Sequence, residues 1–419
     1  PPFYGNVMKV KFNTDKIELE NIKQEFPIIN QEEKPLVYLD TAASSQKPKV
    51  VLDKLNEAYT KYYSNIHSGV HDLSVKSTNG IEEARIKVAK FINAKDPNTV
   101  VFTSGATESI NFISYGLRHR IEEGDNIVIS IAEHHANLIP WQRLCEFSKA
   151  ELRYVKVDAN GTLDYKHFEE LIDKRTKIVA ISHVSNVLGT AFPVFEICRK
   201  AKEFNSITVI DGCQGAVHYK VDVQKLDCDF YVASSHKLYG PSGVGFMYGK
   251  PDLLEEMEPM RLGGGSVAEV SSSGYIFKPY PIKFEAGTPP IAETIAFGSA
   301  VEYLLSIGMD TIVKHDRALL KYLCTRLGEL PYIVFIGKGE SKGSLQSFYI
   351  KEVNSIDLAT LMNTFGVCVR AGQHCAQPLH TYLDIPPTIR ASVGIHNTKE
   401  DIDKFIDALK KSVKILKNV

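Results

Sequence analysis

The sequence has no uninterrupted apolar run long enough to span a bilayer, and residues 8–12 lack the apolar core of a secretory signal. Its net charge is only −1, so no overall electrostatic field would draw the chain to nucleic acid or to an anionic membrane. Low-complexity segments and fixed-period repeats are also missing. What remains is the composition of a soluble globular protein, and a length of 419 residues predicts one large and one smaller domain.

Cys-x-x-Cys pairs are absent too, and the number of cysteines, seven, is odd. A disulfide framework or a structural zinc site is therefore not expected, and we predict no metal. Free thiols suit a reducing compartment, which means the cytoplasm or an organelle interior, with the plastid stroma as the first organellar candidate. Six of the cysteines lie in helical or strand patterns and are expected to be small buried hydrophobic residues. Cys375 differs because it lies on a loop.

Short apolar runs alternate with helical stretches between residues 80 and 250. The runs lie at residues 99–102, 126–129, 177–181, 207–210 and 230–233. They are nearly all apolar, as in strands buried on both faces, and spacings of roughly 20 to 30 residues leave room for crossover helices. The pattern predicts an α/β fold with a mostly parallel central sheet.

The pattern changes near residue 300. Helical segments over 292–329 lead to strand-like runs at 332–335, 347–350 and 367–370, with a helix at 355–365 and a closing helix after Thr398. We interpret residues 26–305 as the large domain and residues 306–419 as a smaller α+β domain, on which the N-terminal arm, residues 1–25, packs. A glycine-rich turn at 263–266 and the segment to Pro281 are expected to form an exposed hairpin.

Polar residues follow each predicted strand of the large domain. The segments are 104–108, 133–137, 183–186, 211–214 and 234–237. Ligands of parallel sheets bind beyond the carboxyl ends of the strands, so we expect these segments to share one site. The first segment opens a helix, whose free N–H groups could bind a phosphate, although an ordinary helix cap is the alternative.

Three segments carry candidate catalytic groups. Lys237 follows a buried strand and is a candidate amine for a Schiff base, the alternative being a lysine that extends to the rim. Asp211 could hold a protonated pyridine nitrogen, or it could cap a turn. His134 could stack on a flat cofactor and exchange protons. A zinc site at His134 and His135 lacks a third ligand at typical spacing.

A second group of candidates lies near the C-terminus. Cys375 follows His374 on a loop near Arg370 and is a candidate nucleophile. The positive charge of Arg370 favours anionic substrates. Arg390 could bind a carboxylate bidentately, or it could be a surface arginine.

These residues form motifs that resemble a known family. The segments Ser234-Ser235-His236-Lys237 and Asp211-Gly212-x-Gln214 are typical of the class V branch of pyridoxal-phosphate-dependent fold type I enzymes. The segment from Arg370 through His374 to Cys375 is more specific and resembles the short cysteine loop of SufS-type (group II) cysteine desulfurases. The resemblance extends over nearly the whole chain.

The resemblance implies a role for each matching residue. Pyridoxal 5'-phosphate would be held by Lys237, with Asp211 at the pyridine nitrogen, Gln214 at the ring oxygen, His134 on the ring, Ala106, Thr107, Ser234 and His236 at the phosphate, and Thr288 at the phosphate of the other subunit. Asn186 and Arg390 would bind the substrate carboxylate beside Arg370. Two positions depart from the family: Ala106 replaces a threonine, and Ser68 replaces an arginine expected at the mouth of the site.

The implied activity is conversion of L-cysteine to L-alanine in a homodimer. Cys375, Lys237 and His134 would be the catalytic residues, and the sulfur would pass from a Cys375 persulfide to a SufE-type acceptor protein in the SUF pathway of iron–sulfur cluster assembly. The alternatives are a selenocysteine lyase, a class V aminotransferase and a non-catalytic pyridoxal-phosphate-binding scaffold of a sulfur-transfer complex.

Overall fold

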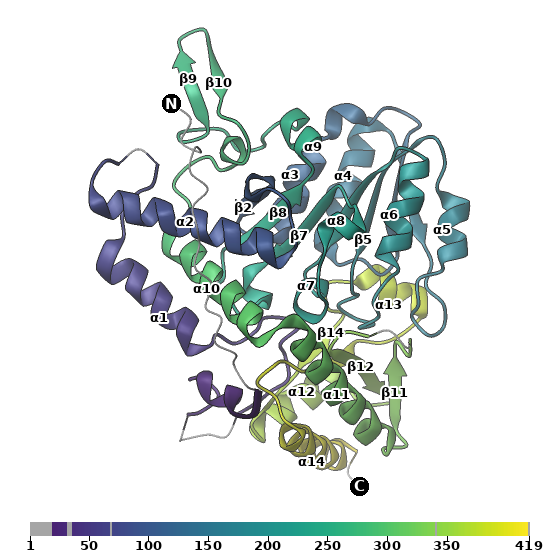
Figure 1. Ribbon diagram of the computed structural model, residues 1–419. Helices are drawn as coiled ribbons and strands as arrows, with labels where there is room; N and C mark the ends of the chain where they lie inside the picture. Colours follow the sequence, from purple (N-terminus) through teal and green to yellow (C-terminus); the bar gives the residue numbers. More distant parts are fainter. Residues whose placement is uncertain (1–18, 32–35, 68, 340–341, 418–419) are drawn as a thin grey trace.

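A seven-stranded sheet forms the centre of the computed structural model, which describes residues 19–31, 36–67, 69–339 and 342–417 (Figure 1). Ser68 and residues 1–18 of the predicted N-terminal arm lie outside these ranges. The strand order is β2 (Val100–Thr103), β8 (Gly245–Gly249), β7 (Phe230–Ser234), β6 (Ile207–Asp211), β5 (Thr176–Ser182), β3 (Asn126–Ser130) and β4 (Glu151–Val155). Only β8 runs antiparallel to its neighbours in this sheet, which confirms the prediction of a mostly parallel sheet.

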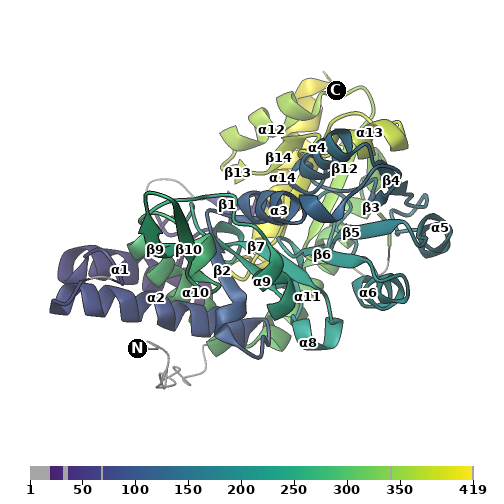
Figure 2. The same cartoon turned by 90° about the horizontal axis from the view of Figure 1, so that it is seen from above.

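Helices cover both faces of this sheet (Figure 1, Figure 2). One face packs on α3 (Ala106–Gly116), α4 (Ile139–Ser148) and α9 (Pro251–Glu256). The other packs on α2 (Asp72–Phe91), α5 (Tyr165–Leu171), α6 (Val194–Glu203), α7 (Gly215–His218), α8 (Val223–Leu226) and α10 (Ile291–Ile307). Successive side chains of a strand point to opposite faces, so Ile127 and Ile129 enter one core while Val128 enters the other. This explains why the strands read as continuous apolar runs.

Two further groups of elements flank the sheet. The first consists of α1 (Lys49–Glu57) and the π-helical turn Ala58–Tyr62, with α1 packed on α10 at one end of the molecule (Figure 2). The second is a protruding hairpin of β9 (Val267–Ser271) and β10 (Gly274–Phe277), which confirms the hairpin predicted after residues 263–266 (Figure 1). Its apolar residues Val270, Tyr275 and Ile276 are exposed.

The C-terminal part contains a second, antiparallel sheet. Its order is β11 (Ile333–Ile336), β12 (Leu345–Ile350), β15 (Thr388–Ser392) and β14 (Arg370–Gly372). It packs with α11 (Met309–Gly328), α12 (Ser355–Thr364) and α14 (Lys399–Leu416) around a core that includes Phe348 and Phe405, and α13 (Gln377–Leu383) follows β14. These elements agree with the α+β pattern expected after residue 306.

The segment near residue 37 joins this C-terminal core. Strand β1 (Val37–Tyr38) pairs in parallel with β13 (Val367–Cys368), and Val37 and Leu39 are buried in the C-terminal core. Lys23, in the 3-10 helix Leu19–Glu25, forms an ion pair with Asp401 of α14 at 2.6 Å. The proposed division of the chain at residues 305 and 306 stays a prediction.

Six cysteines are buried or half-buried as expected, and Cys375 is exposed. Across the described ranges, no single helix has both the length and the apolar character needed to cross a bilayer. The pair α10–α11, bent by 78° at its junction, meets the criterion by length and composition only.

A glycine at the start of β8 brings the sheet close to the helix that follows β2. A Cβ atom at Gly245 would lie 2.5 Å from the Cα of Gly105 and 2.7 Å from the carbonyl oxygen of Ala233. We expect Gly245→Ala to destabilise the protein by about 2 kcal/mol, because backbone atoms would have to move. Urea denaturation followed by circular dichroism measures the change.

Gly328, the last residue of α11, is the matched control, since a Cβ there would meet nothing within 4 Å. Gly328→Ala should be neutral or stabilising by about 0.5 kcal/mol. Equal urea midpoints for the two variants would contradict the close approach at Gly245.

Candidate active site

A cavity of about 260 Å³ lies where the parallel strands of the central sheet end and the C-terminal sheet begins. It brings together nearly all residues singled out from the sequence, contributed by the ends of β5, β6 and β7 and by β14 and β15. The predicted residues that line it are Ala106, Thr107, His134, Asn186, Asp211, Gln214, Ser234, His236, Lys237, Arg370, Cys375 and Arg390. Thr288 does not line this cavity; it is exposed between the 3-10 helix Ile282–Phe284 and α10.

The cavity also has lining residues to which the sequence analysis gave no role. Ala136, Val184, Cys213 and His374 belong to the predicted segments, whereas Ala42, Ala43 and Ser182 lie outside them. Ser182 is the last residue of β5, so the rule that ligands meet strand ends could have found it. The alanines carry no chemical signal in the sequence.

A carboxylate and an amine are among the groups that line the cavity. Asp211 ends β6 and is buried, and its Oδ1 accepts the Cys213 N–H at 2.9 Å. Within the described ranges, no lysine, arginine or histidine forms an ion pair with Asp211. Lys237, at the end of the 3-10 helix Ser235–Lys237 after β7, is half-buried in the same cavity. Gln214 donates its Nε2 hydrogen to the carbonyl oxygen of Ala42 at 2.7 Å.

His134 follows β3, and a hydrogen bond holds its ring in one orientation. Its Nδ1 accepts the N–H of Ala136 at 3.1 Å, which leaves Nε2 for a ligand. Burial, together with the charge of Lys237, lowers the pKa of His134 to about 4, so the imidazole is neutral at physiological pH.

A buried carboxyl group precedes His134 in the chain. Glu133 accepts hydrogen bonds from the Ser130 hydroxyl at 2.5 Å, from Nδ2 of Asn137 at 2.7 Å and from the N–H and the hydroxyl of Ser182. Burial raises the pKa of Glu133 to about 7. The network ties the turn that carries His134 to the end of β5.

The N-terminus of α3 forms one end of the cavity. Gly105 caps this helix with φ of 150°, and the N–H of Ala106 donates to the Ser234 hydroxyl at 2.9 Å. A Cβ at Gly105 would lie 3.2 Å from that hydroxyl, so the glycine keeps a cradle open. Thr107 and His236 border the same region, and burial lowers the pKa of His236 to about 4. A helix N-terminus with converging hydroxyls is suited to a phosphate.

These groups fit pyridoxal 5'-phosphate. The cavity offers an amine for its aldehyde, an unpaired buried carboxylate for its ring nitrogen, a neutral imidazole for its ring and a helix N-terminus for its phosphate. The cofactor roles of the individual residues remain those predicted from the sequence.

Two arginines form the opposite end of the cavity. Arg390, in β15, is buried; its Nη1 donates to the Asn186 carbonyl oxygen at 3.0 Å, and its Nη2 lies 3.6 Å from Asp40. Its Nε is buried without a partner among the described residues. Burial lowers the pKa of Arg390 to about 10, so it remains a cation at neutral pH. A cationic side chain that lines the cavity suits a substrate carboxylate.

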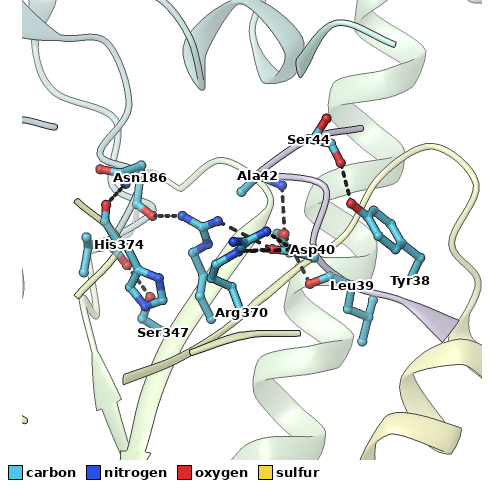
Figure 3. Close-up of polar contacts among 12 residues, drawn as sticks. Tyr38, Leu39, Asp40, Ala42, Ser44, Asn186, Ser347, Arg370 and His374 are labelled. Carbon is cyan, nitrogen blue, oxygen red and sulfur yellow. Dashed lines mark hydrogen bonds and ion pairs between the residues drawn. The ribbon is translucent and has the colours of Figure 1, made fainter. Parts of the chain in front are cut away.

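The cysteine loop is short and firmly attached. It runs between β14, which contains Arg370, and α13. His374 and Cys375 both adopt left-handed backbone conformations, with φ of 52° and 55°. The His374 carbonyl accepts Nδ2 of Asn186 at 2.7 Å (Figure 3), and the Cys375 carbonyl accepts the N–H of His135 at 2.9 Å. These bonds hold an exposed thiol at the cavity wall.

Comparison with known proteins agrees with this geometry. The Aminotransferase class-V family profile matches residues 37–405. Two similar proteins are each named "Probable cysteine desulfurase". One, from Halalkalibacterium halodurans, is 46% identical over 93% of this chain and 97% of its own length. The other, from Synechocystis sp., is 43% identical over 94% of this chain and 95% of its own length.

Solved structures give the same relationship. The crystal structure of the cysteine desulfurase CsdA from Escherichia coli matches with a TM-score of 0.89 and 36% identity, covering 96% of this chain and 100% of that chain. The apo structure of a cysteine desulfurase from Thermococcus onnurineus NA1 matches with a TM-score of 0.91 and 34% identity, covering 98% of this chain and 99% of that chain. The chain therefore belongs to the pyridoxal-phosphate-dependent aminotransferase class-V family, within its cysteine desulfurase branch.

Proposed function

We propose that this protein is a cysteine desulfurase that converts L-cysteine to L-alanine and receives the sulfur on Cys375. The observation that carries the proposal is the exposed Cys375 thiol in the same cavity as Lys237 and the buried Arg390. An aminotransferase or a non-catalytic scaffold has no use for a thiol fixed at this place. The names of the relatives support the same activity.

Each residue has a task that follows from its surroundings. When bound, pyridoxal phosphate supplies a carbonyl for the substrate amine and an electron sink for the α-carbon. Lys237 holds the cofactor and afterwards moves the α-proton with its Nζ. Asp211 would pair with the ring nitrogen of the bound cofactor, and Arg390 with Asn186 would orient the substrate carboxylate. We assign to His134, which lines the cavity, the exchange of thiol protons.

Sulfur transfer is a displacement at the substrate sulfur. The Cys375 thiolate forms a sulfur–sulfur bond, the carbon–sulfur bond of the substrate breaks, and a proton replaces sulfur on the carbon. The balance is one cysteine and one thiol in, one alanine and one Cys375 persulfide out. No external oxidant or reductant is needed.

The attachment of the cysteine loop limits how sulfur can leave Cys375. Cys375 is tied down through the carbonyls of His374 and Cys375, so its persulfide cannot swing far from the cavity. We propose that a small SufE-type acceptor protein brings its own thiol to Cys375, in a reducing compartment and for iron–sulfur cluster assembly. Persulfide release then limits the overall rate.

We expect Cys375→Ala to keep its cofactor but to form almost no alanine or sulfide from L-cysteine, because no other group replaces the nucleophile. Lys237→Ala is the paired variant, and it should lose both turnover and the borohydride-reducible link to pyridoxal phosphate. Alanine, sulfide and keto-acid production are measured together. Full cysteine turnover by Cys375→Ala would exclude the persulfide mechanism, and keto-acid formation by the unaltered protein would indicate an aminotransferase.

Alanine production should be slow with the enzyme alone and faster when a SufE-type protein is added, because the acceptor removes the blocking persulfide. The measurement is steady-state alanine formation with and without the acceptor, together with alkylation and mass spectrometry of Cys375. If the Cys375 persulfide does not accumulate without acceptor, release is not the slow step.

A homodimer should be the working unit, with Thr288 completing the phosphate site of the other subunit. Thr288→Ala should then weaken cofactor binding by about tenfold, the effect of one hydrogen bond to an anion. In a hybrid with a Lys237→Ala subunit, one site keeps both Lys237 and Thr288. That hybrid, purified through two tags, should regain normal cofactor affinity at one site; affinity no better than Thr288→Ala alone would contradict sharing.

A further inference from the structure

Asp40 is the shared counterion of the two arginines at the substrate end of the cavity. It follows β1 and is 7% exposed. Its carboxylate accepts two hydrogen bonds from Nε of Arg370, both at 3.2 Å, and one from Nη2 at 2.6 Å (Figure 3). Nη2 of Arg390 lies 3.6 Å from the same carboxylate. From the sequence, no role was predicted for Asp40.

The charges in this cluster can be counted. Two guanidinium groups and one carboxylate leave one net positive charge. Within the described residues, neither Arg370 nor Arg390 forms an ion pair with any other acidic side chain. The remaining contact of Arg390 is a neutral carbonyl group, that of Asn186. Arg370 is bound to Asp40 through two of its nitrogens, whereas Arg390 keeps a buried Nε without a partner.

The two arginines also differ in what they face. Arg390 is buried beside Asn186, while the side chain of Arg370 is 50% exposed and lies in the cysteine segment of the cavity wall. A substrate whose α-carboxylate meets Arg390 and whose sulfur meets Cys375 therefore has its side chain near Arg370. An anionic side chain would find a second guanidinium there if Asp40 did not occupy it.

We propose that Asp40 determines the charge specificity of the site. Its carboxylate neutralises Arg370, so that only the positive charge of Arg390 remains to bind one carboxylate. The site therefore selects amino acids with an uncharged side chain over dicarboxylates. The inference rests on the proposed function, because it assigns the α-carboxylate of the substrate to Arg390.

The electrostatics support this assignment. The hydrogen bonds that Arg370 donates to Asp40 raise the pKa of Arg370, so its guanidinium group stays charged. Burial lowers the pKa of Arg390, Asp40 opposes that effect, and Arg370 adds to it. Like charges side by side in a partly buried site attract an additional anion unless they are neutralised.

The test is a charge cycle on the holoenzyme with four proteins: the unaltered chain, Asp40→Asn, Arg370→Gln and the double variant. In that order, the cluster of residues 40, 370 and 390 carries a net charge of +1, +2, 0 and +1. Binding of L-alanine and of L-aspartate is measured by calorimetry, which needs no turnover. If the protein formed no alanine from cysteine, the proposed function would be refuted, but the binding affinities of the four proteins could still be compared.

We expect Asp40→Asn to bind L-aspartate about tenfold more tightly, with little change for L-alanine. Arg370→Gln should bind L-alanine about tenfold more weakly, because the released Asp40 then neutralises Arg390. The double variant should return both affinities to within about threefold of the unaltered chain. Such compensation has no explanation if Asp40 merely supports the fold.

Two outcomes would overturn the proposal. One is an unchanged preference between L-aspartate and L-alanine in Asp40→Asn with normal cofactor content. The other is a double variant in which the losses of the single variants add. If Asp40→Asn does not fold, Arg370→Gln decides alone: an unchanged affinity for L-alanine would exclude the charge balance. Asp40→Glu, which keeps the charge, should keep the preference.

Discussion

The arrangement of the site depends on one constraint, that a charge removed from water needs a partner. Arg85, fully buried, is paired with Glu285 and Glu82, and the buried Glu133 is bonded to hydroxyl, amide and N–H donors. Against this background, the unpaired groups of the cavity stand out. Asp211 lacks a cation and the Nε of Arg390 lacks an acceptor within the described residues. In the proposed function, a bound cofactor would pair with Asp211 and a substrate carboxylate with the guanidinium group of Arg390.

The fold determines where these groups meet. Strands of a parallel sheet direct their carboxyl ends to one edge, so β5, β6 and β7 deliver Ser182, Asp211 and Ser234 to neighbouring places. The substrate end comes from another sheet, through Arg390 of β15, and from the β1 segment, through Asp40. In the proposed function, the cofactor site lies at the strand ends of the central sheet, and the substrate carboxylate lies between Asn186, beyond β5, and Arg390 of β15.

The strands predicted from the sequence were those buried on both faces, because such strands read as continuous apolar runs. Strand β4 was missed since it lies at the sheet edge with Glu151 exposed, and β8 was missed since glycines stand at both of its ends. Residues at strand ends, such as Asp211, were predictable from the chain alone. Asp40 was not, because Arg370 lies 330 residues away and only the folded chain shows their contact.

The position of Cys375 combines two requirements that oppose each other. A sulfur acceptor needs the thiol exposed, while displacement at the substrate sulfur needs it fixed. The loop meets both: Cys375 is exposed, but the His374 carbonyl accepts a hydrogen bond from Asn186 and the Cys375 carbonyl accepts one from His135. Asn186 and His135 follow β5 and β3, next to the residues to which we assign the substrate carboxylate and the cofactor ring. If Asn186 also binds the substrate carboxylate, as proposed, the same side chain would orient the nucleophile and the substrate.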